Sequence, residues 1–332
     1  MSDTVNRQFS FPFNGSDAKE YLDRLEGYRD YIHDVYVGLP AIENYFITKT
    51  KKISEDYDDQ CERFLNETKG SWLKRYVPIN ADYTRLTPEE MDELIESVIR
   101  QIDLYAVDGV ICTEIYMAEH IHRERPDVKI NTSCNGFHWS IPQLRTWERR
   151  AGIDLVNPPR EAGRNLGFLK KLHEGGFRIK LLVNEACTLR CPYLSNFCFG
   201  RHKYTGDCFS MLEYDEVNRL QSCMVFPKWL KYLDEYVDVY KITGRYLPSD
   251  HIFGLLDLYI KGEDCSFKDM FASHDEGLDF PTSIIPDRLM FCNYEQCGHG
   301  CDLCETTIEK GLKYAAISRL CSSLATRRQT SK

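Results

Sequence analysis

The segment RIKLLVNEACTLRCPYLSNFCFG, residues 178–200, decides the fold class of this chain. It begins with a run rich in apolar residues, 179–183, which is typical of a strand buried in a parallel sheet. The run ends at Asn184 and Glu185, and three cysteines follow. These are Cys187, Cys191 and Cys198. Because only a loop brings thiols at this uneven spacing round one centre, the segment predicts a metal site at the end of a strand.

Short apolar runs alternate with amphipathic segments on both sides of this strand. Further strands are predicted at residues 9–13, 34–38, 74–79, 109–113, 129–133, 154–157 and 237–242. Helices are predicted at 18–31, within 43–70, and at 87–103, 115–123, 142–150, 162–173 and 212–236. Eight strand–helix units in roughly 260 residues match the size of a (β/α)8 barrel. We therefore predict an α/β TIM-like barrel over residues 1–262, with a doubly wound open sheet as the alternative.

The composition describes a globular chain without an extended basic region. The 332 residues are 42% apolar, and 42 Lys and Arg against 51 Asp and Glu give a net charge of −9. Since no long Lys- or Arg-rich run occurs, the chain carries no strong nucleic-acid signal. The N-terminus lacks a secretion signal, and no apolar run approaches the ~20 residues of a membrane span. We expect a cytoplasmic protein with no membrane span.

Fourteen cysteines are a large number for a cytoplasmic chain. Reducing conditions keep thiols free there, so clustered cysteines indicate metal ligands and not a disulfide framework. The scattered ones are interpreted as inert, small apolar residues. They are Cys61, Cys112, Cys223, Cys265 and Cys321.

A second cysteine cluster lies in the predicted C-terminal extension, residues 263–332, which ends in a terminal helix. Its members are Cys292, Cys297, Cys301 and Cys304. Four thiols within thirteen positions can hold one centre without help, so we predict a site independent of the loop after residue 183. A structural zinc ion and an iron–sulfur cluster both suit four thiolates. Both alternatives stay open.

Several short motifs occupy the predicted strand ends. They are Asp108-Gly109-Val110, Asn131-Thr132-Ser133-Cys134-Asn135, Arg164-Asn165, Asn184-Glu185-Ala186-Cys187 with Cys191-Pro192-Tyr193, and Lys241-Ile242-Thr243-Gly244-Arg245. In this order they resemble the collagenase-like peptidase U32 family over about residues 9–262. The resemblance implies a TIM-like barrel. Some members hydroxylate RNA bases or the ubiquinone ring without oxygen, and for this chain that branch implies a 4Fe-4S cluster near the barrel mouth. The cysteine spacing after Cys191 departs from that branch, so its substrate does not carry over.

Loops that follow the strands of such a barrel converge on one face, where function is expected. There the first cysteine cluster needs a fourth ligand, for which Cys208, His202 or a tail cysteine is available. Asn184 and Cys134 are candidates for cofactor binding. Together with the tail site, the sequence predicts one or two 4Fe-4S clusters, or zinc in the tail.

Three charged residues at the same strand ends are the candidate catalytic groups. Glu185 is the candidate acid or base, and it would otherwise pair with Lys241 or Arg245 to hold the mouth together. Lys241 and Arg245 would bind an anionic group of the substrate or cofactor, or else form a buried structural ion pair.

Three classes of function remain open. The first is an iron–sulfur redox enzyme that hydroxylates or otherwise modifies an unknown substrate at the barrel mouth. The second is a U32-type peptidase, which the family's name implies. The third is a non-catalytic, metal-binding subunit whose tail contacts a protein partner or electron donor. No His pair occurs at the helical spacing of a zinc protease, and no glycine elbow surrounds Ser133 or Ser195.

Overall fold

The computed structural model describes residues 6–40, 56–80, 86–187, 189, 216–271, 278–292 and 301–330. Cys191, Cys198, Cys208, Cys297 and His202 lie outside these ranges.

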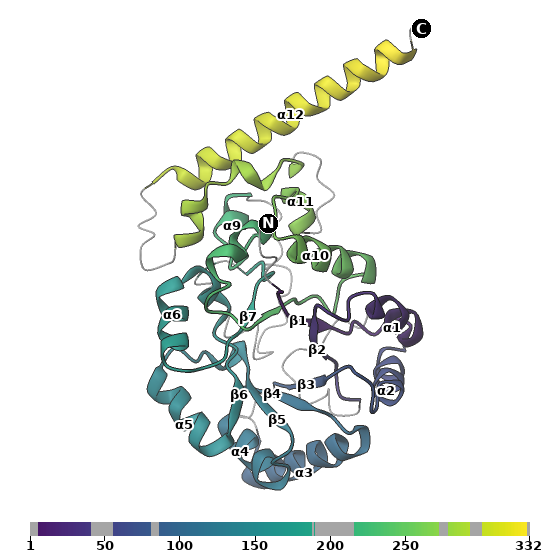
Figure 1. The fold of residues 1–332 in the computed structure, drawn as a ribbon, viewed down its shortest axis with the longest axis vertical. Helices are drawn as coiled ribbons and strands as arrows, with labels where there is room; N and C mark the ends of the chain where they lie inside the picture. Colours follow the sequence, from purple (N-terminus) through teal and green to yellow (C-terminus); the bar gives the residue numbers. More distant parts are fainter. Residues whose placement is uncertain are drawn as a thin grey trace.

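Eight parallel strands form the core of the molecule. They are β1 (Phe9–Pro12), β2 (Ile32–Tyr36), β3 (Arg75–Ile79), β4 (Gly109–Cys112), β5 (Lys129–Thr132), β6 (Ile153–Leu155), β7 (Lys180–Leu182) and β8 (Val239–Lys241). They pair in the order β6-β5-β4-β3-β2-β1-β8-β7. A parallel bridge between Val156 and Ile179 joins the two ends of this sheet. The predicted TIM-like barrel is therefore confirmed (Figure 1).

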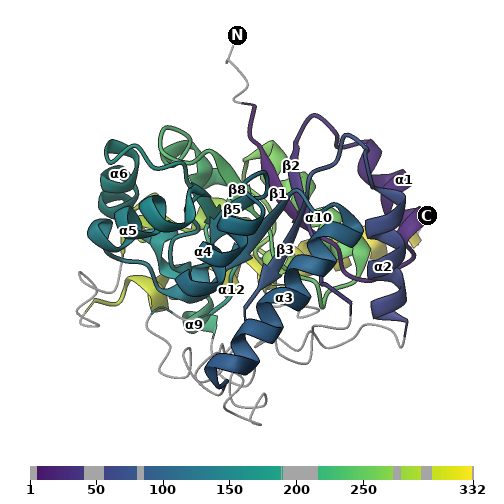
Figure 2. The ribbon, with the colours of Figure 1, turned by 90° about the horizontal axis from the view of Figure 1, so that it is seen from below.

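Helices surround the strands on the outside, as Figures 1 and 2 show. They are α1 (Ala18–Glu26), α2 (Tyr57–Glu67), α3 (Pro88–Tyr105), α4 (Ile115–Glu124), α5 (Ile141–Ala151), α6 (Leu166–Glu174) and α10 (Ser249–Lys261). The predicted start of α3 is confirmed, because Thr87 and Glu90 form a capping box with Pro88 in the first turn. Apolar residues of these helices pack against the outward faces of the strands in one continuous core.

The helix predicted over residues 212–236 is wrong in its middle part. The structure has a short helix α9 (Glu216–Leu220) and a 3-10 helix η5 (Pro227–Tyr232). Between them the backbone runs beside the end of β7: Cys223 N donates to Cys187 O at 2.7 Å, and Val225 N donates to Val183 O at 2.8 Å. These long-range hydrogen bonds outweigh the local helix propensity of the sequence.

The interior of the barrel contains a small apolar cluster and a buried ion pair. The apolar cluster consists of Tyr36, Tyr76 and Ile111. A Cβ atom on Gly109 would lie 2.3 Å from Cε1 of Tyr76, so only glycine leaves room for this ring.

The buried ion pair joins Asp34 of β2 and Lys180 of β7. Asp34 Oδ2 lies 2.7 Å from Lys180 Nζ, and both side chains are fully buried. Ser10 Oγ donates to Asp34 Oδ1 at 2.6 Å, and His33 Nδ1 lies 2.6 Å from Oδ2. Burial alone would raise the pKa of Asp34, but Lys180 and His33 lower it below its ordinary value overall. Asp34 is therefore an ionised carboxylate, and Lys180, Ser10 and His33 contact its two oxygens.

The C-terminal extension lies beside the barrel, next to α9 and α10 (Figure 1). It contains α11 (Phe267–Met270), the 3-10 helices η7 (Thr282–Ile284) and η8 (Asp287–Phe291), and the long helix α12 (Leu303–Thr330). Helix α12 packs against α9 and η7 and then points away from the body.

One buried arginine of the barrel fastens this extension. Arg164 Nε donates to Met290 O at 3.1 Å, and its Nη2 donates to Leu289 O. Its Nη1 donates to Leu220 O at 3.2 Å and to Ser222 O at 3.0 Å. One side chain thus joins the loop after β6 to α9 and to η8.

Within the described ranges, none of the helices has both the length and the hydropathy required to cross a membrane.

Candidate active site at the barrel mouth

The residues that directly follow β5, β6, β7 and β8 meet at the carboxyl end of the barrel. They include the 3-10 helices η3 (Cys134–Gly136) and η4 (Arg160–Arg164), residues 184–187 and residues 241–245. This is the face on which barrels of this type carry their sites.

Arg160 lies at the centre of this face and links three strand ends. Its Nη2 donates to Asn135 Oδ1 at 2.6 Å, and its Nη1 donates to Cys187 Sγ at 3.4 Å. The same Nη1 lies 3.4 Å from Glu185 Oε2. Arg160 is absent from the residues predicted for the site. It follows the β6 run in Asn157-Pro158-Pro159-Arg160, so its position after a strand end is the signal that could have found it.

Glu185 is half-buried at the mouth, and its role as an acid or base stays a prediction. Its ion pair within the described part of the chain is with Arg160, and not with Lys241 or Arg245. The predicted alternative for Glu185, an ion pair that holds the mouth together, is therefore formed with Arg160 as the cation. The carboxylate forms an ion pair with the same guanidinium that contacts Cys187, so the acid, the cation and the thiol lie in one group.

Asn184 joins the ends of β7 and β8. Its Nδ2 donates to Thr243 O at 2.8 Å, and its Oδ1 accepts from Thr243 N at 2.7 Å. These two bonds reproduce a backbone-like pairing across the loop ends. Asn184 thereby positions the strand ends on which Glu185 and Lys241 stand, and a role for Asn184 in cofactor binding stays a prediction.

Cys187 and Cys223 are neighbours at the mouth. Burial raises the pKa of the Cys187 thiol well above its ordinary value, and the Glu185 carboxylate raises it further. Burial likewise raises the pKa of Cys223, which is 1% exposed. The place of Cys223 beside Cys187 was not foreseen, because 36 residues separate the two in the chain.

The donor chemistry of this group fits a soft metal. Sulfur ligands are preferred by zinc and by iron–sulfur clusters. Within the described ranges, however, no three His, Cys, Asp or Glu side chains are placed to hold one metal ion. A metal bound by Cys187 would therefore need ligands from outside the described ranges.

Three cysteines of the tail cluster are described. Cys292 and Cys304 are half-buried, and Cys301 is exposed. Cys292 Sγ donates to Arg288 O at 3.6 Å. The fourth member, Cys297, lies outside the described residues, so the independent tail site stays a prediction.

Lys241 and Arg245 approach the ring of Tyr36 from the end of β8. Lys241 Nζ lies 4.4 Å from the ring centroid, and the Arg245 guanidinium carbon lies 5.8 Å from it. The Tyr36 hydroxyl donates to Ile242 O at 2.8 Å. Lys241 is 8% exposed, and Cys134 at the end of β5 is similarly buried. The strand-end residues predicted for the site thus line one region of the mouth.

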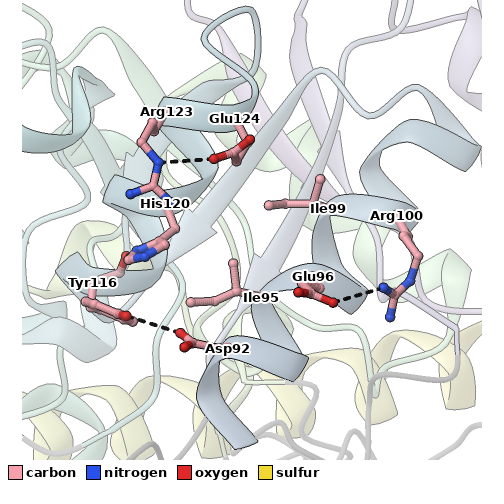
Figure 3. Close-up of a pocket in the computed structure, with 9 residues that line it drawn as sticks. All are labelled: Asp92, Ile95, Glu96, Ile99, Arg100, Tyr116, His120, Arg123 and Glu124. Atoms are coloured by element: carbon pink, nitrogen blue, oxygen red, sulfur yellow. Dashed lines mark hydrogen bonds and ion pairs between the residues drawn. The ribbon is translucent and has the colours of Figure 1, made fainter. Parts of the chain in front are cut away.

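A separate hollow of about 510 Å³ lies on the outer surface between α3 and α4 (Figure 3). Its polar side chains contact one another: Tyr116 donates to Asp92 at 3.1 Å, and Arg123 donates to Glu124 at 3.1 Å. None of the predicted site residues lines it. We therefore assign the candidate site to the barrel mouth and not to this hollow.

Comparison with known proteins agrees with the fold. No protein-family model matches the chain. Over 243 residues it is 24% identical to an uncharacterized protease of Methanocaldococcus jannaschii, which covers 68% of this chain and 71% of that protein. Among solved structures, a U32 peptidase superposes with a TM-score of 0.53 at 14% identity and covers 75% of this chain and 97% of its own. The resemblance expected from the strand-end motifs is confirmed.

Proposed function

Since the chain resembles the U32 peptidases in fold and in its strand-end motifs, we propose that it is an iron–sulfur redox enzyme whose substrate binds at the barrel mouth. One observation carries this proposal. A buried arginine, Arg160, donates a hydrogen bond to the sulfur of Cys187, the first thiol of the cysteine-rich segment. Cationic donors of this kind stabilise thiolates that bind a metal and tune their potential.

The residues of the mouth have distinct parts in this proposal. Cys187 would hold the cluster together with Cys191, Cys198 and either Cys208 or Cys223. A bound 4Fe-4S cluster would supply one-electron transfer. Arg160 orients the Cys187 sulfur and offsets its negative charge, and Asn135 fixes the orientation of Arg160.

Two further mouth residues would act on the substrate. Glu185 would take or give a proton at the substrate, since its carboxylate lies beside the same Arg160 guanidinium that contacts Cys187. Arg245 would contact an anionic group of the substrate.

The tail would provide a second centre, either zinc or a second cluster that exchanges electrons with a partner protein. Cys292 follows η8, which Arg164 fastens to the barrel, and Cys304 lies in the first turn of α12. The hydrogen bonds of Arg164 to Leu289 and Met290 therefore hold the backbone just before Cys292 against the barrel.

Metal analysis of protein purified without oxygen tests the proposal. The wild-type chain is expected to contain iron and acid-labile sulfide, and Cys187→Ala is expected to lose the iron of the mouth site. Its free energy of unfolding should change by no more than about 1 kcal/mol, because the residue lies on a loop above the core strands. Cys321→Ala, at an exposed position of α12, is the matched control and should keep its full metal content. Iron content in Cys187→Ala equal to that of the wild type would contradict the proposal. Zinc found beside iron in the wild-type protein would identify zinc as the metal of the tail site.

Peptide hydrolysis is the second candidate function. The observation in its favour is that both similar proteins are named as a protease or a peptidase. Among the described thiols of the mouth, Cys134 is the candidate nucleophile, and Lys241 is the candidate base. Cleavage of casein by metal-free protein, abolished in Cys134→Ser, would establish this function in place of the redox one.

A further inference from the structure

Two buried lysines of neighbouring strands differ in whether their amine has an acidic partner. Lys180 of β7 lies over the ring of Tyr76 at 4.5 Å and is paired with Asp34 at 2.7 Å. Lys241 of β8 lies over the ring of Tyr36 at 4.4 Å in a similar way. Within the described part of the chain, Lys241 has neither an ion pair nor a hydrogen bond to its amine. The amine of Lys180 thus has a carboxylate partner, and among the described residues the amine of Lys241 does not.

Strand register places the unpaired amine nearer the mouth. Lys180 is opposite Val239 in the β7–β8 ladder, and Lys241 is opposite Leu182. Lys241 therefore stands two residues closer to the carboxyl end of the sheet, the end at which the candidate site lies. Its side chain is more than nine-tenths buried, yet it belongs to the layer that borders the mouth.

The surroundings of Lys241 favour the neutral amine. Burial is the main cause that lowers the pKa of Lys241 to about 8. The charged and titratable groups that face it are Cys134 on η3, Asp34 and Tyr36 on β2, Lys180 on β7, and Arg245. Cys134 and Asp34 raise the pKa of Lys241, whereas Lys180 and Arg245 lower it. A desolvated lysine beside other cations is the environment in which amines act as nucleophiles.

We propose that Lys241 is a nucleophilic amine that forms an imine with a carbonyl group of a ligand bound at the barrel mouth. This inference goes beyond the redox proposal, because it needs no metal. The Nζ lone pair attacks the carbonyl carbon, a C–N bond forms, the C=O π bond breaks, and one amine proton moves to the carbonyl oxygen. The carbinolamine then loses its hydroxyl group together with the second amine proton as water, and the C=N bond remains. No electron is gained or lost in this step, and no further reactant is required.

Reductive trapping tests the proposal. The full-length protein, purified without oxygen, is incubated with glyoxylate and sodium cyanoborohydride, which reduces an imine to a stable secondary amine. Peptide mapping by mass spectrometry then measures the modified fraction of each lysine. We expect labelling of Lys241 to rise to half its maximum near pH 8, whereas solvent-exposed lysines gain reactivity only toward their ordinary pKa of about 10.4. Near pH 7 the neutral fraction of Lys241 is then about 200-fold that of an exposed lysine.

The chain supplies its own controls. Lys180 is equally buried but held by Asp34, and it should stay unmodified. Lys241→Arg keeps the positive charge and cannot form an imine, so it should lose the pH 8 label, whereas binding of an anion alone would leave Lys241 itself unlabelled in the wild type. Lys241→Met serves the same purpose if the arginine variant does not fold.

Two outcomes overturn the proposal. One is a Lys241 pH profile that coincides with the profile of exposed lysines. The other is failure of both glyoxylate and the smaller probe formaldehyde to modify Lys241 in folded protein. Because labelling is scored at a residue and not through activity, it is independent of the iron content, and the two proposals fail separately.

Discussion

Asp34→Asn is expected to lower the free energy of unfolding by about 3–5 kcal/mol, because it leaves the Lys180 cation buried without a counter-charge. Both members of the pair are fully buried at 2.7 Å, and Ser10 and His33 also bond to the carboxylate. The amide can accept hydrogen bonds at one oxygen only and carries no charge. Urea unfolding at neutral pH, followed by circular dichroism, measures the change.

Two comparisons show whether the unpaired charge is the cause. The double variant Asp34→Asn/Lys180→Met replaces the unpaired lysine with an apolar side chain of similar length. It should recover a large part of the free energy of unfolding that Asp34→Asn loses. Glu174→Gln breaks an exposed pair with Lys170 at 3.8 Å and should cost less than 1 kcal/mol. A double variant no more stable than Asp34→Asn would show that the carboxylate itself, through Ser10 and His33, is what the barrel needs.

Arg164→Met is expected to lower the free energy of unfolding by about 2–4 kcal/mol and to loosen the C-terminal extension. The arginine donates to four backbone carbonyls, those of Leu220, Ser222, Leu289 and Met290. Each carbonyl left buried without a donor costs about 1–3 kcal/mol unless it moves into water. Because movement is the less costly response, amide hydrogen exchange should increase mainly in residues 287–292 and in α9.

The matched control for Arg164 is Arg149→Met on α5. Arg149 is an exposed arginine that donates to Thr146 Oγ1 at 3.3 Å, so its replacement should leave both stability and exchange unchanged. Uniform acceleration of exchange over the whole barrel in Arg164→Met would contradict a fastening role and would indicate general destabilisation. Loss of protection confined to the extension would support it.

The barrel could be predicted from the sequence because its signals are local. A parallel strand buried on both faces needs a short apolar run, and a surface helix needs an apolar stripe and a cap, so eight alternating units are visible in the chain. Thr87 and Glu90 show this most clearly, since their capping box depends on four consecutive residues. Pro78 has no N–H group to donate within a sheet, yet it pairs with Ile111 in β4.

The middle of the 212–236 segment could not be predicted in the same way. Its residues have helical propensity, but the backbone N–H groups of Cys223 and Val225 donate hydrogen bonds to the strand end at 183–187. No local sequence pattern predicts a hydrogen-bond partner 36 to 42 residues away in the chain. The same long-range pairing brings Cys223 beside Cys187. The sequence alone can classify a cysteine as buried, but it does not show what is buried next to it.

The candidate site divides along the same line. Sequence by itself determined which residues reach the mouth, because in a parallel barrel the residues after each strand must lie at one end: this placed Glu185, Cys187 and Lys241 together. Only the tertiary structure decided how they pair. Glu185 forms an ion pair with Arg160 from another strand end, and Asp34 pairs with Lys180 but not with Lys241. Ion pairs form between side chains that barrel closure and strand register bring within a few ångströms of each other. The order of residues along the chain shows neither the closure nor the register.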